Sequence, residues 1–278
     1  MKKISVLTVG SRGDIEPFIA LAKELMSKGY EVQLVTHWDF LHIASKYGVD
    51  VVPLSLSTKE FTAPLMNAPE MNPFTTIRIM RGILAPLLES ILPEMWKAAS
   101  DSDAIISSGT TLWGLDIAEK LQVPHVLAAL QPLFPTEEFS HPSMINLPEW
   151  GGFFNQLSYV VVGYSYWLSI ANTINNWRED YLNLPKKIDK FIDPDVWRTQ
   201  LHLLGYSSLV IPQPTDWVGN VVTTGYWRLP LCDYLVPYCF GFGKISSCPS
   251  LTSNPCASKQ PLIATARSKV LISSASGI

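Results

Sequence analysis

The feature that most constrains this chain is the alternation of short apolar runs with amphipathic stretches along its first half. Ile4–Val9, Glu31–Thr36 and Val49–Leu54 have the length and composition of buried strands. Apolar residues recur at helical spacing over Phe18–Leu25, and Gly29 follows as a stop signal. Strands separated by helices favour a parallel sheet that is covered on both faces. The pattern therefore predicts an α/β fold built on a Rossmann-like, doubly wound parallel sheet.

Further elements of both kinds follow along the chain. Asp39 is expected to cap the helix after the second strand, because an aspartate side chain can accept hydrogen bonds from first-turn amides. In chain order, the remaining predicted elements are a helix over Phe40–Tyr47, a strand over Ala104–Ser107, a helix around Leu112–Leu121, a strand over Val126–Leu130, and closing strands around Ser208–Ile211 and Val218–Thr223.

Two proline-rich stretches with little periodicity, Ser55–Pro73 and Pro132–Pro148, follow predicted strands. The carboxyl ends of parallel strands meet at one edge of the sheet, and open α/β folds bind their ligands there. We therefore expect a binding cleft at this edge, bordered by both stretches.

The segment Gly151–Trp177 carries no charged side chain and is long enough to cross a bilayer. Polar and apolar residues nevertheless occupy different faces of a helix. The polar set is Ser158, Ser165, Ser169, Asn172 and Asn176, and the apolar set is Leu157, Val160, Tyr164, Trp167, Ala171 and Ile174. This pattern predicts an amphipathic helix that packs on the core or touches a membrane surface, rather than a spanning segment.

Charge and composition exclude several classes of protein. The net charge of -3 offers no basic field for nucleic acid, which is excluded as a partner. Arg12 and Asp14 interrupt the first apolar run before it can act as a secretory signal. The four cysteines lie between Cys232 and Cys256 without the spacing of a zinc site. They are expected to be reduced thiols in a cytoplasmic protein.

The character of the sequence changes at about Arg228, where periodicity fades and serine becomes frequent. We therefore expect a folded domain over residues 1–227 and an irregular tail over residues 228–278.

Several short blocks stand in a fixed order along residues 1–227. They are Leu7–Leu21 (LTVGSRGDIEPFIAL), Gly109–Thr111 with Asp116–Leu121 (DIAEKL), Gln131–Pro132 with Pro135–Phe139 (PTEEF), Asn175–Arg178 (NNWR) with Tyr181–Pro185 (YLNLP), and Pro212–Trp217 (PQPTDW) with Thr224–Trp227 (TGYW). Together they resemble the N-terminal domain of the UDP-sugar glycosyltransferases that act on sterols, glycolipids and glycopeptide antibiotics.

The resemblance implies the acceptor-binding half of a two-domain, GT-B enzyme, in which a second Rossmann-like domain holds the nucleotide sugar. That donor domain normally carries a His-Cys-Gly stretch and an Asp-Gln pair, and this sequence contains neither. We therefore expect an incomplete hexosyltransferase, with residues 228–278 as a remnant of the donor domain or the product of an altered reading frame. The alternative is a non-catalytic acceptor-binding module that needs a donor domain from a separate chain.

The implied reaction moves a hexose, glucose from a UDP-sugar, onto a sterol- or lipid-like hydroxyl with inversion. Inversion needs a base that takes the hydroxyl proton, and the resemblance assigns this role to Asp14. Asp14 also stands just before a predicted helix, where an aspartate commonly acts as an N-cap, so both roles stay open. By resemblance, Ser11, Arg12 and Gly13 lie near the sugar or its diphosphate. The alternatives are a solvated surface position for Arg12 and a tight strand-to-helix turn for Gly13. The UDP-sugar is a co-substrate, and neither a cofactor nor a metal ion is expected.

Three polar residues that follow predicted strands, Thr110, Thr111 and Gln131, are candidates for substrate binding at the same edge. Such hydroxyls and amides also close turns, which is the alternative role. His37 follows a strand as well and is expected to be structural.

The uncharged helix is a candidate for contact with an apolar acceptor, with core packing as the alternative. Its aromatic residues of interest are Tyr159, Tyr164, Tyr166 and Trp167. A nicotinamide-dependent oxidoreductase is a weaker alternative, because Gly10 and Gly13 do not make the dinucleotide fingerprint.

Overall fold

The computed structural model describes residues 2–66, 73–144, 151–187, 200–217 and 220–229, with residues 65, 66 and 73–80 described as backbone only. The chain divides into two compact units, Met1–Trp227 and Arg228–Ile278. Every described helix and strand belongs to the first unit. The four cysteines lie outside the described residues.

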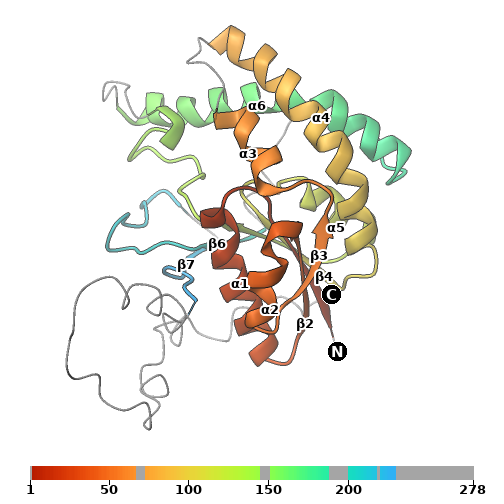
Figure 1. Ribbon diagram of the computed structural model, residues 1–278. Helices are drawn as coiled ribbons and strands as arrows, with labels where there is room; N and C mark the ends of the chain where they lie inside the picture. The colour runs from red at the N-terminus through yellow and green to blue at the C-terminus, as the bar shows by residue number, and fades with distance from the viewer. Residues whose placement is uncertain (1, 67–72, 145–150, 188–199, 218–219, 230–278) are drawn as a thin grey trace, which may run out of the picture. The chain divides into compact units, whose positions relative to one another are not determined.

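One parallel sheet of seven strands forms the centre of the first unit (Figure 1). Its order is β3-β2-β1-β4-β5-β6-β7, and every neighbouring pair is parallel. The strands are β1 (Lys3–Leu7), β2 (Glu31–His37), β3 (Asp50–Leu54), β4 (Ala104–Ser108), β5 (His125–Ala129), β6 (Leu201–Leu204) and β7 (Val221–Thr223). The predicted α/β class with a doubly wound parallel sheet is confirmed.

The helices bury the sheet and complete the core. They are α1 (Arg12–Ser27), α2 (Leu41–Lys46), α3 (Thr58–Met66), α4 (Pro73–Ala99), α5 (Gly114–Leu121) and α6 (Gly152–Asp180), with short 3-10 turns η1 (Trp38–Phe40) and η2 (Pro142–Met144). The long helices α4 and α6 pack against each other, as Figure 1 shows. Leu88 and Ile91 of α4 join Trp167 and Ile174 of α6 in one apolar cluster with Leu7 of β1. Burial of the central strands from both sides explains their continuous apolar composition.

The strand predicted over Ser208–Ile211 is wrong, because β6 is Leu201–Leu204. Residues 208–211 form a turn in which the Ser207 carbonyl accepts two amides at 3.0 and 3.1 Å. The Ser207 hydroxyl also accepts the Leu209 amide at 3.2 Å. A serine that bonds to nearby amides offers the backbone a local alternative to sheet pairing. The apolar run is therefore at the surface, with Leu209 95% exposed.

The stretch Ser55–Pro73, predicted as an irregular loop, contains helix α3. Ser57 and Glu60 explain its start: the Glu60 carboxylate accepts the Ser57 amide at 2.7 Å, and the Ser57 hydroxyl accepts the Glu60 amide at 3.2 Å. The Asp39 carboxylate accepts the Thr58 amide at 3.0 and 3.1 Å, so it caps α3. The prediction that Asp39 caps the next helix in sequence is wrong, because Asp39 lies within η1 and Phe40 holds the N-cap position of α2.

The two halves of α6 orient their apolar residues differently. In the second half, Trp167 and Ile174 are buried as predicted. In the first half, Ser158 is buried and Val160 is exposed, so the predicted apolar face is wrong there. Ser158 points inward because its hydroxyl accepts the His141 amide at 2.7 Å. Among the helices that the structure describes, none is both long and apolar enough to cross a membrane.

Candidate functional site

The candidate site lies where the strand order of the sheet reverses. From β1 the chain moves outward to β2 and β3, and then returns to the other side of β1 as β4. Loops that leave two such strands diverge to opposite faces and open a crevice between them, where open α/β folds bind ligands. Two groups of predicted site residues follow these strands: residues 11–14 at the start of α1 after β1, and residues 110–111 after β4.

The turn after β1 is built around the carboxylate of Asp14. Asp14 Oδ2 accepts the Ser11 amide at 2.8 Å and the Ser11 hydroxyl at 2.7 Å. Gly10 has a φ of +132°, and a Cβ on it would lie 2.6 Å from Asp14 Oδ2, so this turn needs glycine. Ser11 is the N-cap residue of α1 and Asp14 is the third helical residue. The predicted N-cap position of Asp14 is therefore wrong, and the carboxylate instead closes a capping box from within the first turn.

This arrangement holds one oxygen of Asp14 and leaves the other available. The Thr8 hydroxyl donates to the Asp14 carbonyl at 3.0 Å and fixes the backbone. Within the described residues, Asp14 Oδ1 accepts no hydrogen bond, and the side chain is half-buried. A carboxylate fixed through one oxygen can accept a proton from an incoming hydroxyl through the other.

Arg12 and Gly13 lie on the exposed side of the same turn. Arg12 forms an ion pair with Glu16 one helical turn later. The first amides of a helix as long as α1 attract negative charge, because they have no partner within the helix. The segment therefore has the chemistry to receive a diphosphate, and the roles of Ser11, Arg12 and Gly13 stay predictions.

His37, at the end of β2, supports this turn from the neighbouring strand. Its Nε2 accepts the Gly10 amide at 3.1 Å, and its Nδ1 lies 2.8 Å from the Leu56 carbonyl oxygen. Only a neutral ring protonated on Nδ1 satisfies both bonds. Burial lowers the pKa of His37, which favours the same neutral form. Both ring nitrogens serve the backbone, in agreement with the structural role predicted for this residue.

Thr110 and Thr111 use their hydroxyls to join the ends of β1 and β4. Thr111 is buried, donates to the Leu7 carbonyl at 2.8 Å and accepts the Ser108 amide at 3.0 Å. The Thr110 hydroxyl donates to the Val9 carbonyl at 2.6 Å. These bonds tie the start of the loop after β4 to the end of β1. Both residues lie at the predicted edge, and whether either also binds substrate stays a prediction.

Gln131 is exposed on the loop after β5, and its side chain makes no hydrogen bond within the described residues. Of the four aromatic residues predicted to contact an acceptor, Tyr159 and Trp167 are buried, whereas Tyr164 is exposed. Burial raises the pKa of Tyr159 and of Tyr166. Packing therefore accounts for most of this aromatic set, and Tyr164 stands apart from it.

The loops after β5 and β6 are fastened to each other by polar contacts that the sequence analysis missed. Asp216 accepts the Thr136 hydroxyl at 2.7 Å and the Glu137 amide at 2.8 Å. In the reverse direction, Glu138 accepts the Thr215 amide and hydroxyl at 2.8 and 3.1 Å. We call this set of contacts the loop latch. Its signal in the sequence is the presence of hydroxyl and carboxylate residues in both of the blocks PTEEF and PQPTDW.

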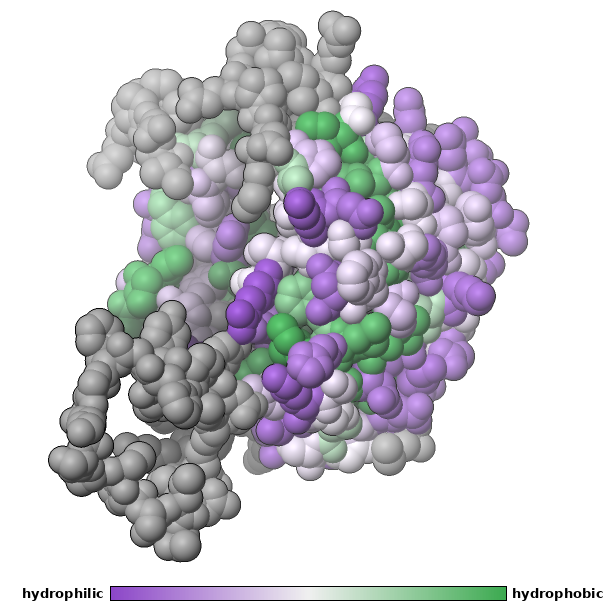
Figure 2. Space-filling model, in the orientation of Figure 1, coloured by the Kyte–Doolittle hydropathy of each residue, from purple (hydrophilic) through white to green (hydrophobic). Residues whose placement is uncertain are grey.

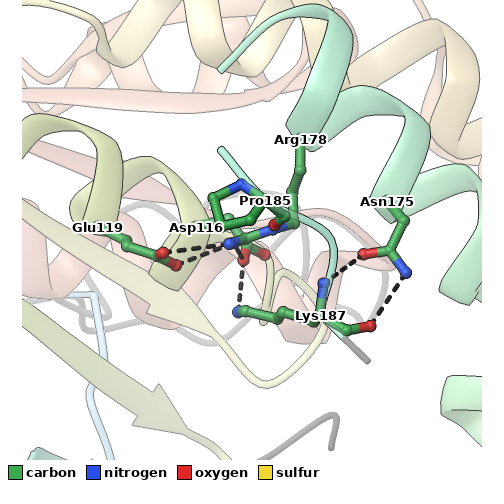
Figure 3. Close-up of polar contacts among 6 residues, drawn as sticks. All are labelled: Asp116, Glu119, Asn175, Arg178, Pro185 and Lys187. Atoms are coloured by element: carbon green, nitrogen blue, oxygen red, sulfur yellow. Dashed lines mark hydrogen bonds and ion pairs between the residues drawn. The ribbon is translucent and has the colours of Figure 1, made fainter. Parts of the chain in front are cut away.

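A separate ionic cluster accounts for two further sequence blocks (Figure 3). The Arg178 side chain is 2% exposed and pairs with Asp116 and, at 2.9 and 3.1 Å, with both carboxylate oxygens of Glu119. Lys187 Nζ lies 2.5 Å from Asp116 Oδ1. Asn175 donates to the Lys187 carbonyl at 3.1 Å and accepts its amide at 2.9 Å. The cluster fastens the end of α6 and the following segment to α5, so these residues stabilise the fold.

A hollow of about 360 Å³ lies beside the start of β5, lined by residues that include Glu119, His125 and Gln200. It is at the amino edge of the sheet and contains none of the predicted site residues. Within the described ranges, no group of three or more His, Cys, Asp or Glu residues is arranged to hold a metal ion.

Comparison with known proteins shows what the first part of the chain is similar to. Residues 4–140 match the glycosyltransferase family 28 N-terminal domain. Over 82% of its length, the chain is 32% identical to a sterol 3-beta-glucosyltransferase of Pichia angusta and covers 18% of it. Over 84% of its length, it is 30% identical to a sterol 3-beta-glucosyltransferase of Leptosphaeria maculans and covers 16% of it. The chain thus spans less than a fifth of either relative.

The fold is also similar to that of a calicheamicin glycosyltransferase, CalG4. The TM-score is 0.51 and the identity is 15%, over 81% of this chain and 53% of the other. This likeness concerns the fold alone, and it confirms the expected GT-B type of α/β architecture.

Proposed function

Residues 4–140 of this chain are a glycosyltransferase family 28 N-terminal domain, and we propose from this premise that the chain is the acceptor-binding part of a glycosyltransferase. The proposed reaction is transfer of glucose from UDP-glucose to the hydroxyl of a sterol or similar lipid, with inversion at the anomeric carbon. The substrate class is supported by the names of the two fungal relatives. We also propose that the UDP-sugar binds to a donor domain. That domain belongs either to the same polypeptide or to a separate chain.

The observation that carries the proposal is the asymmetric bonding of Asp14 where the strand order reverses. Ser11 holds Oδ2 with two hydrogen bonds, and Oδ1 accepts none within the described residues. Asp14 therefore serves the turn and the reaction with different oxygens.

In the proposed step, the acceptor oxygen attacks the anomeric carbon from the side opposite the UDP. The new carbon–oxygen bond forms while the bond to the diphosphate oxygen breaks, and its electron pair leaves with UDP. Asp14 takes the proton of the acceptor hydroxyl, and releases it to solvent after the products leave. The first-turn amides of α1 stabilise negative charge that develops on the diphosphate.

We also propose that the protein is cytoplasmic and contacts a membrane peripherally, because a sterol acceptor resides in bilayers. Neither a cofactor nor a metal ion takes part in the proposed reaction.

The test replaces the matching region of the Pichia angusta enzyme with residues 1–227 of this chain and measures glucose transfer to a sterol from radiolabelled UDP-glucose. Asp14→Asn in this chimera is expected to lower kcat by about 10²–10⁴-fold, because it removes the proton acceptor and keeps the size of the side chain. Asp50→Asn is the matched control, since Asp50 is exposed at the start of β3. Equal kcat values for the two variants would refute the assignment of Asp14.

A second measurement separates acceptor binding from chemistry. The Asp14→Asn variant of the complete 278-residue chain is expected to bind a fluorescent sterol as the unsubstituted chain does. In the proposed reaction, Asp14 accepts the proton of the sterol hydroxyl and does not contact the sterol rings. Absence of sterol binding by the unsubstituted chain, together with an inactive chimera, would contradict the proposed acceptor class.

A further inference from the structure

We propose that the first half of α6 lies on the surface of an uncharged lipid bilayer through an outer stripe made of Phe153, Leu157, Val160 and Tyr164. These side chains are 72%, 40%, 61% and 58% exposed. Their spacing places them on one face of a helix, one above the other. This stripe is the surface that would make the peripheral membrane contact of the proposed function. Its binding to a bilayer does not depend on the sugar-transfer reaction.

The orientation of the stripe is set by contacts on the opposite side of the helix. The Asn155 side chain donates to the Glu137 carbonyl at 2.7 Å, and the Ser158 hydroxyl accepts the His141 amide at 2.7 Å. Tyr159 is buried beside them. Turning the stripe inward would break these bonds and bury the polar residues without partners, which is costly. The fold therefore holds this apolar face outward, whereas the apolar face of an amphipathic helix usually faces the core.

Charge favours a lipid surface over a protein as the occupant of the stripe. No residue from Gly151 to Trp177 is charged, so this part of α6 offers no ion pair to the polar rim of a protein partner. The net charge of -3 also disfavours an anionic membrane. An uncharged apolar face matches the acyl boundary of a zwitterionic bilayer, where Tyr164 can place its ring in the apolar layer and its hydroxyl in water.

The size of the stripe leads to the same choice. Four side chains with these exposures present about 400 Å² of surface, roughly half of what each partner buries in a stable protein–protein interface. A patch of this size is sufficient for a helix that lies in the plane of the membrane interface. Hydrophobic side chains reach the surface at the centre and left of Figure 2, whereas hydrophilic side chains dominate its right side.

The experiment is flotation of the complete 278-residue chain with phosphatidylcholine vesicles free of sterol, at low and high salt. The unsubstituted chain is expected to float equally at both salt concentrations, because no charge contributes to the contact. Phe153→Ser with Tyr164→Ser is expected to lower the vesicle partition coefficient about tenfold or more. Val160→Lys is expected to act in the same direction. Trp38→Ser with Leu41→Ser, at exposed apolar positions outside α6, is the matched control and should float like the unsubstituted chain.

Three outcomes would overturn the proposal. In the first, the unsubstituted chain is recovered entirely with the soluble fraction. In the second, the stripe variants float as the unsubstituted chain does. In the third, sedimentation shows a dimer that the stripe variants convert to a monomer, and neither form floats, so a second copy is the occupant. Circular dichroism melting of each variant confirms folding. Because the vesicles lack sterol and no sugar is transferred, failure of this proposal is distinguishable from failure of the proposed function.

Discussion

Replacement of Arg178 by methionine is expected to destabilise the first unit by about 3–5 kcal/mol, the usual cost of removing one partner of a buried ion pair. The Arg178 side chain is 2% exposed and that of Asp116 is 5% exposed, so neither charge can recover its hydration in the folded state. After the substitution, Lys187 is the one ionic partner that Asp116 keeps among the described residues. The Pro185 carbonyl also loses the hydrogen bond from Arg178 Nε at 2.9 Å.

The second carboxylate of the cluster provides the comparison. The Glu119 side chain is 39% exposed, so water can replace part of what Arg178 gives it. Glu119→Gln is therefore expected to cost only about 0–1 kcal/mol, the range of a solvent-accessible pair. The double variant Arg178→Met with Asp116→Leu removes both buried charges and is expected to recover much of the lost stability.

Urea titration followed by tryptophan fluorescence measures these free energies of unfolding, and thermal melting measures them independently. For a folded unit of this size, 3–5 kcal/mol corresponds to a decrease in Tm of roughly 6–20 °C. A loss below about 1 kcal/mol for Arg178→Met, or a double variant no more stable than the single one, would refute the argument from burial.

Two further predictions concern the turn after β1. Because burial lowers the pKa of His37 below 6.5, the stability that its neutral ring confers is present above that value and is lost as the pH falls through the interval below it. His37→Gln is expected to flatten the pH dependence of the unfolding free energy between about pH 7.5 and 5, measured by urea titration, and an unchanged slope would contradict this account. Gly10→Ala is expected to cost about 2 kcal/mol or more, since its Cβ would meet Asp14 at 2.6 Å in addition to the backbone strain. Gly29 also has a positive φ, but a Cβ on it would have no neighbour within 4 Å, so Gly29→Ala measures the backbone strain alone. Equal losses of unfolding free energy for the two variants would show that the contact between the new Cβ and Asp14 contributes nothing.

Most of the sheet could be predicted because its strands are short, apolar and separated by recognisable helices. Val6, Leu34 and Ile105 are fully buried, and each lies in a run that local composition identifies. The sixth strand could not be found in this way, because His202 interrupts it and a stronger apolar run follows at Ser208–Ile211. What selects Leu201–Leu204 is its pairing with β5 and β7, a long-range property that no local pattern contains.

The edge that carries the candidate site was predictable, whereas the bonds that build it were not. Asp39 caps a helix that begins at Thr58, and Thr111 donates to Leu7, which lies 104 residues earlier in the sequence. In the same way, periodicity detects the apolar face of α6 but not its exposure, because the Ser158 contact that turns this face outward comes from a loop. Such pairings depend on tertiary structure, so residue type and spacing alone leave several roles open for each residue.

The loop latch has a practical consequence for protein engineering. Because Asp216 accepts two donors from the loop after β5, and Glu138 accepts two from the loop after β6, the two loops form one exchangeable cassette. Transplanting residues 131–141 alone from a relative removes the donors of Asp216 and the acceptor of Thr215. Residues 131–141 and 206–217 should therefore be exchanged together in any chimera.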